Sequence, residues 1–133
     1  AMLAAGAAEL IVVVRPGDEA VAETALAGLP GWRAVAGGAE RADSVRAGLA
    51  TVSGTCEAVL IHDAARPLVT PAHVAALLEA LDGAEGSVPA LPVADTLKRQ
   101  PPGEFVTVSR ENLWRAQTPQ AFRLSTLRAD PAT

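Results

Sequence analysis

Short apolar runs alternate with longer segments of helical periodicity from residue 10 to residue 91. The four runs that we predict to be buried strands are residues 10–14, 32–36, 58–61 and 87–91. The three segments between them that we predict to be helices are residues 19–26, 41–52 and 71–81. Continuous apolar runs of this length are typical of strands covered on both faces. The alternation therefore predicts an α/β fold with a parallel sheet and right-handed crossovers.

The pattern changes after residue 92. Residues 94–98 and 105–109 read as the two strands of a hairpin, joined across the turn residues Gln100-Pro101-Pro102-Gly103. A lone hairpin is too small to be stable in water. We therefore expect this arm, residues 92–110, to pack on another surface such as a partner chain. A last helix is predicted to begin near Pro119 and to carry Phe122, Leu124 and Leu127.

The composition indicates one domain built largely from small apolar side chains. Of the 133 residues, 50% are hydrophobic and 3% aromatic, so we expect a core of Ala, Val and Leu. The net charge of −4 argues against nucleic acid, because domains that bind it are usually basic. Cys56 is the only cysteine, which excludes an internal disulfide and favours a reducing compartment. No apolar run approaches the roughly 20 residues of a membrane helix, so we expect a cytoplasmic protein without a membrane partner.

The most informative motif is the run that ends in His62-Asp63-Ala64-Ala65-Arg66-Pro67. In open α/β sheets, ligands bind beyond the carboxyl ends of the strands, where Asp63 is expected to stand. A carboxylate there can hold Mg²⁺ through oxygen, and an arginine can bind a phosphate with two hydrogen bonds. The alternative is that Asp63 and Arg66 only pair with each other or hold the loop in place. His62 is interpreted as a hydrogen-bonded, partly buried residue rather than a general base, since no nucleophile stands beside it.

A second motif, Gly37-Gly38, lies between a predicted strand and a predicted helix. Paired glycines allow a ligand to approach the backbone closely, and a helix N-terminus favours phosphate. Ser44 and Gly48 lie four residues apart, which gives a stripe of small residues on which a flat group can rest. The alternative is a tight turn with Asp43 or Ser44 as the helix N-cap, and the stretch by itself favours that alternative.

Two polar stretches follow in the last third of the chain. Thr96 and Lys98 share one face of an extended segment, so they either present donors to an anion or belong to a solvated hairpin. Residues 110–120 contain two arginines, two glutamines and a threonine that can form an oxyanion pocket. Thr118-Pro119 also has a purely structural interpretation, because proline suits the first position of a helix. The same pair occurs at Thr70-Pro71.

Four blocks occur in a specific order: GGAERADSVRAGL from residue 37, VLIHDAARPLVTP from 59, PVADTLKR from 92 and RENLWRAQTPQAF from 110. This set resembles the 2-C-methyl-D-erythritol 4-phosphate cytidylyltransferase family of the non-mevalonate isoprenoid pathway. The resemblance implies a Rossmann-like, mostly parallel sheet flanked by helices, with a protruding β-hairpin arm that builds a homodimer. It also implies a nucleotidyltransferase that moves CMP from CTP to 2-C-methyl-D-erythritol 4-phosphate with Mg²⁺ and releases pyrophosphate.

The resemblance further implies roles for individual residues. Gly38 and Ser44 match positions that contact the cytidine of CTP, and Ala64 lies beside the nucleotide. Asp63 matches the catalytic acid associated with Mg²⁺ and the triphosphate. The positions that match the methylerythritol phosphate side are Arg66, Thr96, Arg110 and Thr118. Arg110 is implied to orient the acceptor phosphate for attack, and some of these residues are implied to reach the neighbouring subunit through the arm.

The resemblance covers residues 1–133 as a single nucleotidyltransferase domain. The family's N-terminal glycine-rich loop and its C-terminal end, each with a catalytic lysine, have no counterpart in this sequence, so we expect the natural protein to be longer. Two alternatives stay open: a ribitol-phosphate cytidylyltransferase and a non-catalytic nucleotide-binding or dimerisation fragment. The Ala64-Ala65 pair and the Asp-Thr-Leu-Lys block favour the methylerythritol enzyme by resemblance.

Overall fold

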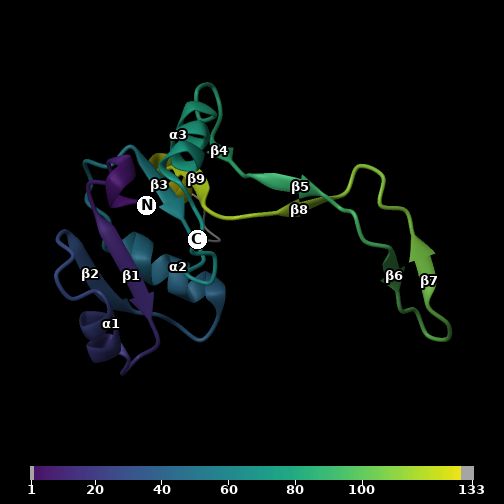
Figure 1. Cartoon of the computed structure of the whole chain (residues 1–133), viewed down its shortest axis with the longest axis horizontal. Coiled ribbons are helices and arrows are strands. Elements are labelled where there is room, and N and C mark those ends of the chain that lie inside the picture. The colour runs from purple at the N-terminus through teal and green to yellow at the C-terminus, as the bar shows by residue number, and fades with distance from the viewer. Residues whose placement is uncertain (1, 130–133) are drawn as a thin grey trace.

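The computed structural model describes residues 2–129 and divides into a globular part and a long arm (Figure 1). The chain opens with a short 3-10 helix, η1 (Leu3–Ala5), and then forms a parallel pair of strands. Strand β1 (Leu10–Val14) pairs with β2 (Trp32–Ala36), and helix α1 (Glu19–Ala25) connects them. All three elements match the predicted apolar runs and the predicted helix closely, so this strand–helix–strand unit is confirmed.

Helix α2 (Arg41–Ala50) follows β2 and packs on the parallel pair through its small residues. Gly48 is buried, and a Cβ at this position would lie 3.1 Å from a methyl group of Val13. The stripe formed by Ser44 and Gly48 is therefore partly used for helix–strand packing, and the prediction that it supports a flat ligand is wrong at Gly48. The helix begins at Arg41 as predicted, and its N-cap is Glu40, whereas the tight-turn alternative placed the N-cap at Asp43 or Ser44.

A separate antiparallel sheet has the order β3 (Ala58–Ile61), β9 (Gln120–Arg123), β4 (Gly86–Ser87). The prediction of a mostly parallel sheet is therefore wrong for the described residues, in which β1 and β2 form the parallel pair and the other ladders are antiparallel. The predicted helix near Pro119 is also wrong, because residues 120–123 add to β3 as a strand. Helix α4 (Leu124–Ala129) begins only after that strand.

Burial of Ala121 explains why this segment is a strand. Ala121 is fully buried and packs with Leu77 and Leu81 in the small core of the sheet. Leu77 belongs to helix α3 (Pro71–Glu79), which begins as predicted at Thr70-Pro71: the Thr70 hydroxyl accepts a hydrogen bond from the His73 backbone N–H at 3.3 Å. Tertiary pairing thus decides the structure of the second Thr-Pro segment, where the Thr118–Pro119 peptide is cis.

The predicted strand at 87–91 is divided into two. β4 ends at Ser87 and stays in the globular part, whereas β5 (Ala90–Pro92) leaves it and pairs with β8 (Trp114–Ala116). The division falls at Val88 and Pro89, and proline lacks the backbone N–H that a continuous ladder needs. The arm therefore starts at the end of β4 and returns into β9 (Figure 1).

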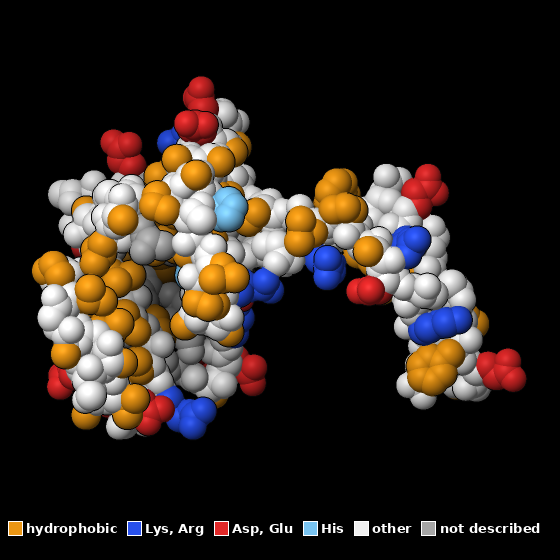
Figure 2. All heavy atoms as spheres, viewed as in Figure 1, with side chains coloured by type: hydrophobic (Ala, Val, Ile, Leu, Met, Phe, Trp, Pro, Cys, Tyr) orange, Lys and Arg blue, Asp and Glu red, His pale blue; other side chains and the backbone are white. Residues whose placement is uncertain are grey.

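The outer part of the arm is the predicted hairpin, formed by β6 (Leu97–Arg99) and β7 (Val106–Val108). Lys98 stands opposite Thr107, and its ammonium group donates to the Thr107 hydroxyl at 2.8 Å. Hydrophobic side chains are exposed along the arm (Figure 2); they are Leu91, Phe105, Val106, Leu113 and Trp114. Within residues 2–129, none of the helices has the length and apolar character needed to cross a membrane.

Candidate active site

The loop after β3 places Asp63 at the carboxyl end of that strand, as predicted. The Asp63 carboxylate lies 3.2 Å from the Arg41 guanidinium and 3.7 Å from Nε of Arg66. A backbone hydrogen bond of 3.0 Å from Arg66 N–H to the Asp63 carbonyl closes the turn between them. The side chains of all three are 40–61% exposed, so the ion pairs are solvent-screened and contribute little to stability. Asp63 and Arg66 are therefore paired, but not only with each other, because Asp63 also pairs with Arg41 and Arg66 also donates to Gln117.

His62 and Thr118 join this loop to the segment before β9. The Thr118 hydroxyl lies 3.2 Å from Nδ1 of His62 and accepts a hydrogen bond from the Asp63 backbone N–H at 3.1 Å. The other ring nitrogen of His62 lies 3.0 Å from the Arg66 carbonyl. His62 is half-buried and has a partner at both ring nitrogens. The interpretation of His62 as a hydrogen-bonded, partly buried histidine is confirmed.

Gln117 provides a second link between the same two segments. Its side-chain carbonyl accepts a hydrogen bond from Arg66 at 2.5 Å, and its backbone N–H donates to the Pro89 carbonyl at 2.8 Å. Residues 62–66 and 117–118 therefore form one polar cluster, which we call the strand-end cluster. It consists of His62, Asp63, Arg66, Gln117 and Thr118.

The Gly37-Gly38 turn lies next to this cluster because Arg41, at the start of α2, is paired with Asp63. The Gly38 backbone N–H donates to the Ser44 hydroxyl at 3.2 Å. A Cβ on Gly37 would lie 2.7 Å from the Ser44 hydroxyl, and one on Gly38 would collide with the side chain of Asp43. The glycines are thus needed for packing on the first turn of α2, which supports the tight-turn interpretation.

The remaining predicted site residues lie apart from the strand-end cluster or on its edge. Ala64 is exposed in the loop beside Asp63. Thr96 and Arg110 lie in the arm, which extends away from the globular part in Figure 1, and the Arg110 guanidinium donates to the carbonyl of Ala94. A single chain therefore brings together Asp63, Arg66 and Thr118, with the Gly38–Ser44 turn adjacent, but not Thr96 and Arg110.

Sequence reasoning missed two members of this region, Arg41 and Gln117. Arg41 is part of the GGAERADS block, and a positive charge next to a glycine turn was the sequence feature that could have marked it as a site residue. Gln117 belongs to the polar stretch that was predicted to form a pocket beside a helix N-terminus. That helix is absent at this position, so Gln117 acts through its contacts with Arg66 and Pro89 instead.

The donor set at Asp63 fits a magnesium ion only in part. Across residues 2–129, no group of three or more His, Cys, Asp or Glu side chains converges in a way that could hold a metal by itself. Mg²⁺, however, is commonly held by one or two carboxylates together with substrate phosphates and water. The exposed carboxylate of Asp63 is suited to that sharing, and the adjacent Arg41 and Arg66 are suited to phosphate oxygens.

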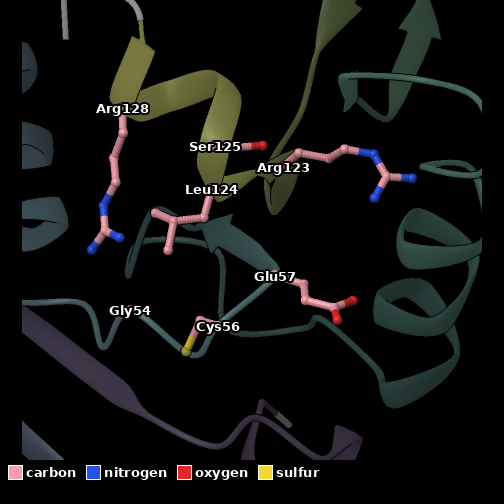
Figure 3. Close-up of a pocket in the computed structure, with 7 residues that line it drawn as sticks. All are labelled: Gly54, Cys56, Glu57, Arg123, Leu124, Ser125 and Arg128. Carbon is pink, nitrogen blue, oxygen red and sulfur yellow. The ribbon is translucent and has the colours of Figure 1, made fainter.

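The hollow shown in Figure 3 is a different place, at the start of β3 rather than its end. It has a volume of about 330 Å³ and is lined by Gly54, Cys56, Glu57, Arg123, Leu124, Ser125 and Arg128. The two guanidinium groups point apart in Figure 3. Arg123 donates to the carbonyls of Leu81 and Ala84, and Arg128 donates to that of Val52. These arginines support the local backbone, and the hollow contains none of the predicted site residues.

Two groups near that hollow have shifted pKa values. The hydrogen bond from Arg33, 2.8 Å long, is the main cause that lowers the pKa of the Glu9 carboxyl. Burial, and then the neighbouring Glu9, raise the pKa of the Cys56 thiol. Because the thiolate is the reactive form, Cys56 is a poor nucleophile. Neither group belongs to the strand-end cluster.

Comparison with known proteins agrees with the arrangement of these motifs. The family described as "IspD: 2-C-methyl-D-erythritol 4-phosphate cytidylyltransferase" matches residues 1–132. The chain belongs to this family. The match includes the turn at Gly38, the strand-end cluster and the arm, so the resemblance inferred from the four sequence blocks is confirmed.

Similar proteins include both single-function and bifunctional members of the family. A bifunctional enzyme IspD/IspF from Caulobacter vibrioides is 59% identical over 96% of the chain and 34% of its own length. A 2-C-methyl-D-erythritol 4-phosphate cytidylyltransferase from Cereibacter sphaeroides is 48% identical over 95% of the chain and 57% of its own length. The crystal structure of the enzyme of that name from Thermus thermophilus superposes with a TM-score of 0.78 at 38% identity, covering 96% of the chain and 60% of that protein. The chain thus spans between a third and three fifths of the length of these relatives.

Proposed function

We propose that the protein transfers CMP from CTP to 2-C-methyl-D-erythritol 4-phosphate and releases pyrophosphate. The family match over residues 1–132 supports the reaction. The observation that carries the proposal is the strand-end cluster, in which Asp63 is hydrogen-bonded directly to Thr118 and Arg66 is linked to Thr118 through His62. Ligands of open α/β sheets bind at such edges. Residues 1–133 form one nucleotidyltransferase domain in this proposal. Its arm was expected at residues 92–110, and in the structure it also includes β5 and β8.

The nucleotide side of the proposed site is formed by the Gly38–Ser44 turn and the loop after β3. Gly38 and Ser44 contact the cytidine, Ala64 lies beside the nucleotide, and the carboxylate of Asp63 serves a magnesium ion. Mg²⁺ would supply neutralisation of the triphosphate charge when bound. Arg41 and Arg66, which neutralise Asp63 in the free protein, are then free to pair with phosphate oxygens.

The acceptor side of the proposed site uses Arg66 and Thr118 from the same chain and Thr96 and Arg110 from an arm. Because Thr96 and Arg110 lie far out on the arm (Figure 1), we propose that they reach the site of a second copy of the chain. The exposed Leu91 and Trp114 support this homodimer, since large apolar side chains on a thin arm gain stability by burial against a partner. Arg110 orients the acceptor phosphate.

The residue types fit the chemistry of the reaction. A phosphate oxygen of the acceptor attacks the α-phosphorus of CTP, the bond from that phosphorus to the bridging oxygen breaks, and pyrophosphate leaves with the electron pair. Both reactants are anions, so positioning and charge neutralisation dominate, and no protein nucleophile is needed. Arginines and one carboxylate at a solvent-accessible edge can position the two anions and neutralise their charge. The proposal gives His62 no role as a general base, because both of its ring nitrogens already have hydrogen-bond partners.

Pyrophosphate release tests the proposal and separates it from both alternatives. The protein expressed from its natural reading frame is supplied with CTP, Mg²⁺ and either 2-C-methyl-D-erythritol 4-phosphate or ribitol phosphate. We expect release only with the first acceptor. Equal or exclusive use of ribitol phosphate would replace the proposed acceptor. CTP binding without release with either acceptor would support a non-catalytic nucleotide-binding module.

A further inference from the structure

The imidazole of His62 connects the residues proposed for the two substrates. Its Nε2 atom lies 3.0 Å from the Arg66 carbonyl oxygen, which can only accept a hydrogen bond, so Nε2 carries the proton. Nδ1 of the neutral ring is then an acceptor, and the Thr118 hydroxyl, 3.2 Å away, donates to it. The Thr118 oxygen in turn accepts from the Asp63 backbone N–H at 3.1 Å. With a neutral ring, the partners thus assign one direction to every hydrogen bond in this chain of contacts.

This assignment restricts what Thr118 can offer to a ligand. Its only hydrogen points at His62, and one of its two lone pairs is used by the Asp63 N–H. The remaining lone pair can accept one hydrogen bond. A hydroxyl group of a polyol phosphate can donate that bond, whereas the oxygens of a fully ionised phosphate cannot. The His62 ring thereby determines which part of the acceptor suits Thr118.

We propose that His62 is a positioning residue that fixes the direction of the Thr118 hydroxyl and holds the Asp63–Arg66 loop against the segment before β9. The acceptor-side effect rests on the proposed function, because it takes Thr118 as a residue of the acceptor side. Through these contacts His62 keeps the proposed nucleotide residue Asp63 at a fixed separation from Thr118. It acts through these neighbours and contacts neither substrate.

Two substitutions separate the two hydrogen bonds of the ring. His62→Gln places an amide nitrogen near the position of Nε2, which keeps the bond to the Arg66 carbonyl and removes the acceptor for Thr118. His62→Asn places an amide oxygen near the position of Nδ1, which keeps the acceptor and removes the bond to Arg66. Thr118→Val removes the hydroxyl, and Thr118→Ser restores it. Circular dichroism and thermal melting confirm that each variant is folded before its kinetics are compared.

The kinetic test is a double-mutant cycle in kcat and in KM for the acceptor. We expect His62→Gln and Thr118→Val each to lower kcat/KM for the acceptor about 10-fold, with KM for CTP changed less than about 2-fold. Because His62 acts through Thr118, the double variant should lose no more than either single variant. Thr118→Ser should recover most of the kcat/KM that Thr118→Val loses, and His62→Asn, which keeps the acceptor for Thr118, should lose less than His62→Gln. Losses that multiply to about 100-fold in the double variant would overturn the proposal.

A second measurement is independent of turnover. Nitrogen-15 NMR of labelled imidazoles, recorded at about pH 8.5 where neutral rings dominate, should show the Nε2–H tautomer for His62. The Nδ1 resonance should move in Thr118→Val and stay in Thr118→Ser. His73→Gln assigns the signal of the second histidine. An Nδ1–H tautomer, or an Nδ1 resonance whose chemical shift is unchanged in Thr118→Val, would overturn the proposal. A protein that shows the expected resonances but no turnover would contradict the proposed function alone.

Discussion

The guanidinium of Arg41 lies 3.2 Å from the carboxylate of Asp63 and ties the first turn of α2 to the loop after β3. The two residues are 22 positions apart in sequence, and their pair is a contact between the helix that follows the Gly38 turn and the strand-end cluster. The pair is solvent-exposed, with 61% and 40% of the two side chains accessible. Such a pair contributes about 0–1 kcal/mol to folding. Its importance in our account is therefore for ligand binding rather than for stability.

Replacing Arg41 by Gln should separate these two roles. We expect the free energy of unfolding to change by less than about 1 kcal/mol, whereas KM for CTP should rise about 10-fold, since a charge-assisted hydrogen bond is worth about 1.5–3 kcal/mol. Steady-state kinetics and urea denaturation measure the two quantities. Arg46→Gln, which removes an arginine paired with Asp43 on the same helix, is the matched control. An unchanged KM for CTP in Arg41→Gln would exclude Arg41 from the nucleotide side.

Gly38→Ala distinguishes the two interpretations of the glycine turn. The added Cβ would collide with the side chain of Asp43, so we expect the free energy of unfolding to fall by about 1–3 kcal/mol. Chemical denaturation measures this change. Gly54→Ala is the control, because nothing lies within 4 Å of a Cβ at that position. If Gly38→Ala is as stable as the parent but binds CTP poorly, the glycine is required for ligand approach instead.

The pairing of Glu9 with Arg33 should make the free energy of unfolding depend on pH in the acid range. Because the pKa of Glu9 is lowered from its ordinary value of 4.5, its contribution is complete above that value and is lost as the pH falls through the lowered pKa. We expect Glu9→Gln to be less stable than the parent near neutral pH, and the difference to shrink in acid. Urea denaturation across this pH range measures the difference, with Glu23→Gln on α1 as the charge control. A difference that stays constant in acid would contradict the effect of Arg33.

The arm should hold the proposed dimer together through its apolar side chains. Trp114, which is 62% exposed, is the largest of them. We expect Trp114→Ser to weaken self-association by about 2 kcal/mol, a rise of roughly 30-fold in the dissociation constant. Analytical ultracentrifugation measures the constant. Val21→Ser on α1, whose side chain is 66% exposed and lies outside the arm, should leave it unchanged. A parent protein that sediments as a monomer at micromolar concentration would refute the proposed dimer.

The parts of the fold that the sequence predicted well are those set by local pattern. The apolar runs of β1, β2 and β3 match the predicted strands, and the proline of Thr70-Pro71 marks the start of α3. The same dipeptide at Thr118-Pro119 precedes a strand, because β9 pairs with β3 and β4 and buries Ala121. Long-range pairing of this kind overrides a local signal, and four residues are too few to show a clear alternation.

The candidate site also has one part that a local motif predicts and one part that depends on long-range strand pairing. The position of Asp63 at a strand end and its pairing with Arg66 follow from one short motif, since both residues lie in one turn. The contacts of Asp63 with Thr118 and of Arg66 with Gln117 join residues 55 and 51 positions apart. Those contacts depend on the antiparallel register of β3 with β9, which the pattern of residues 119–127 did not predict.

Substitution of Asp63 by Asn tests the central claim most directly, because it removes the charge of one carboxylate and keeps its shape. The measurement is the rate of pyrophosphate release from CTP with 2-C-methyl-D-erythritol 4-phosphate, in the protein expressed from its natural reading frame. Asp82→Asn, in the turn after α3, is the control for the loss of one charge. Our account predicts that Asp63→Asn lowers the rate at least about 100-fold with an unchanged fold, because the charge stabilisation at the triphosphate is worth several kcal/mol. Unchanged CTP binding and turnover in Asp63→Asn would contradict the account.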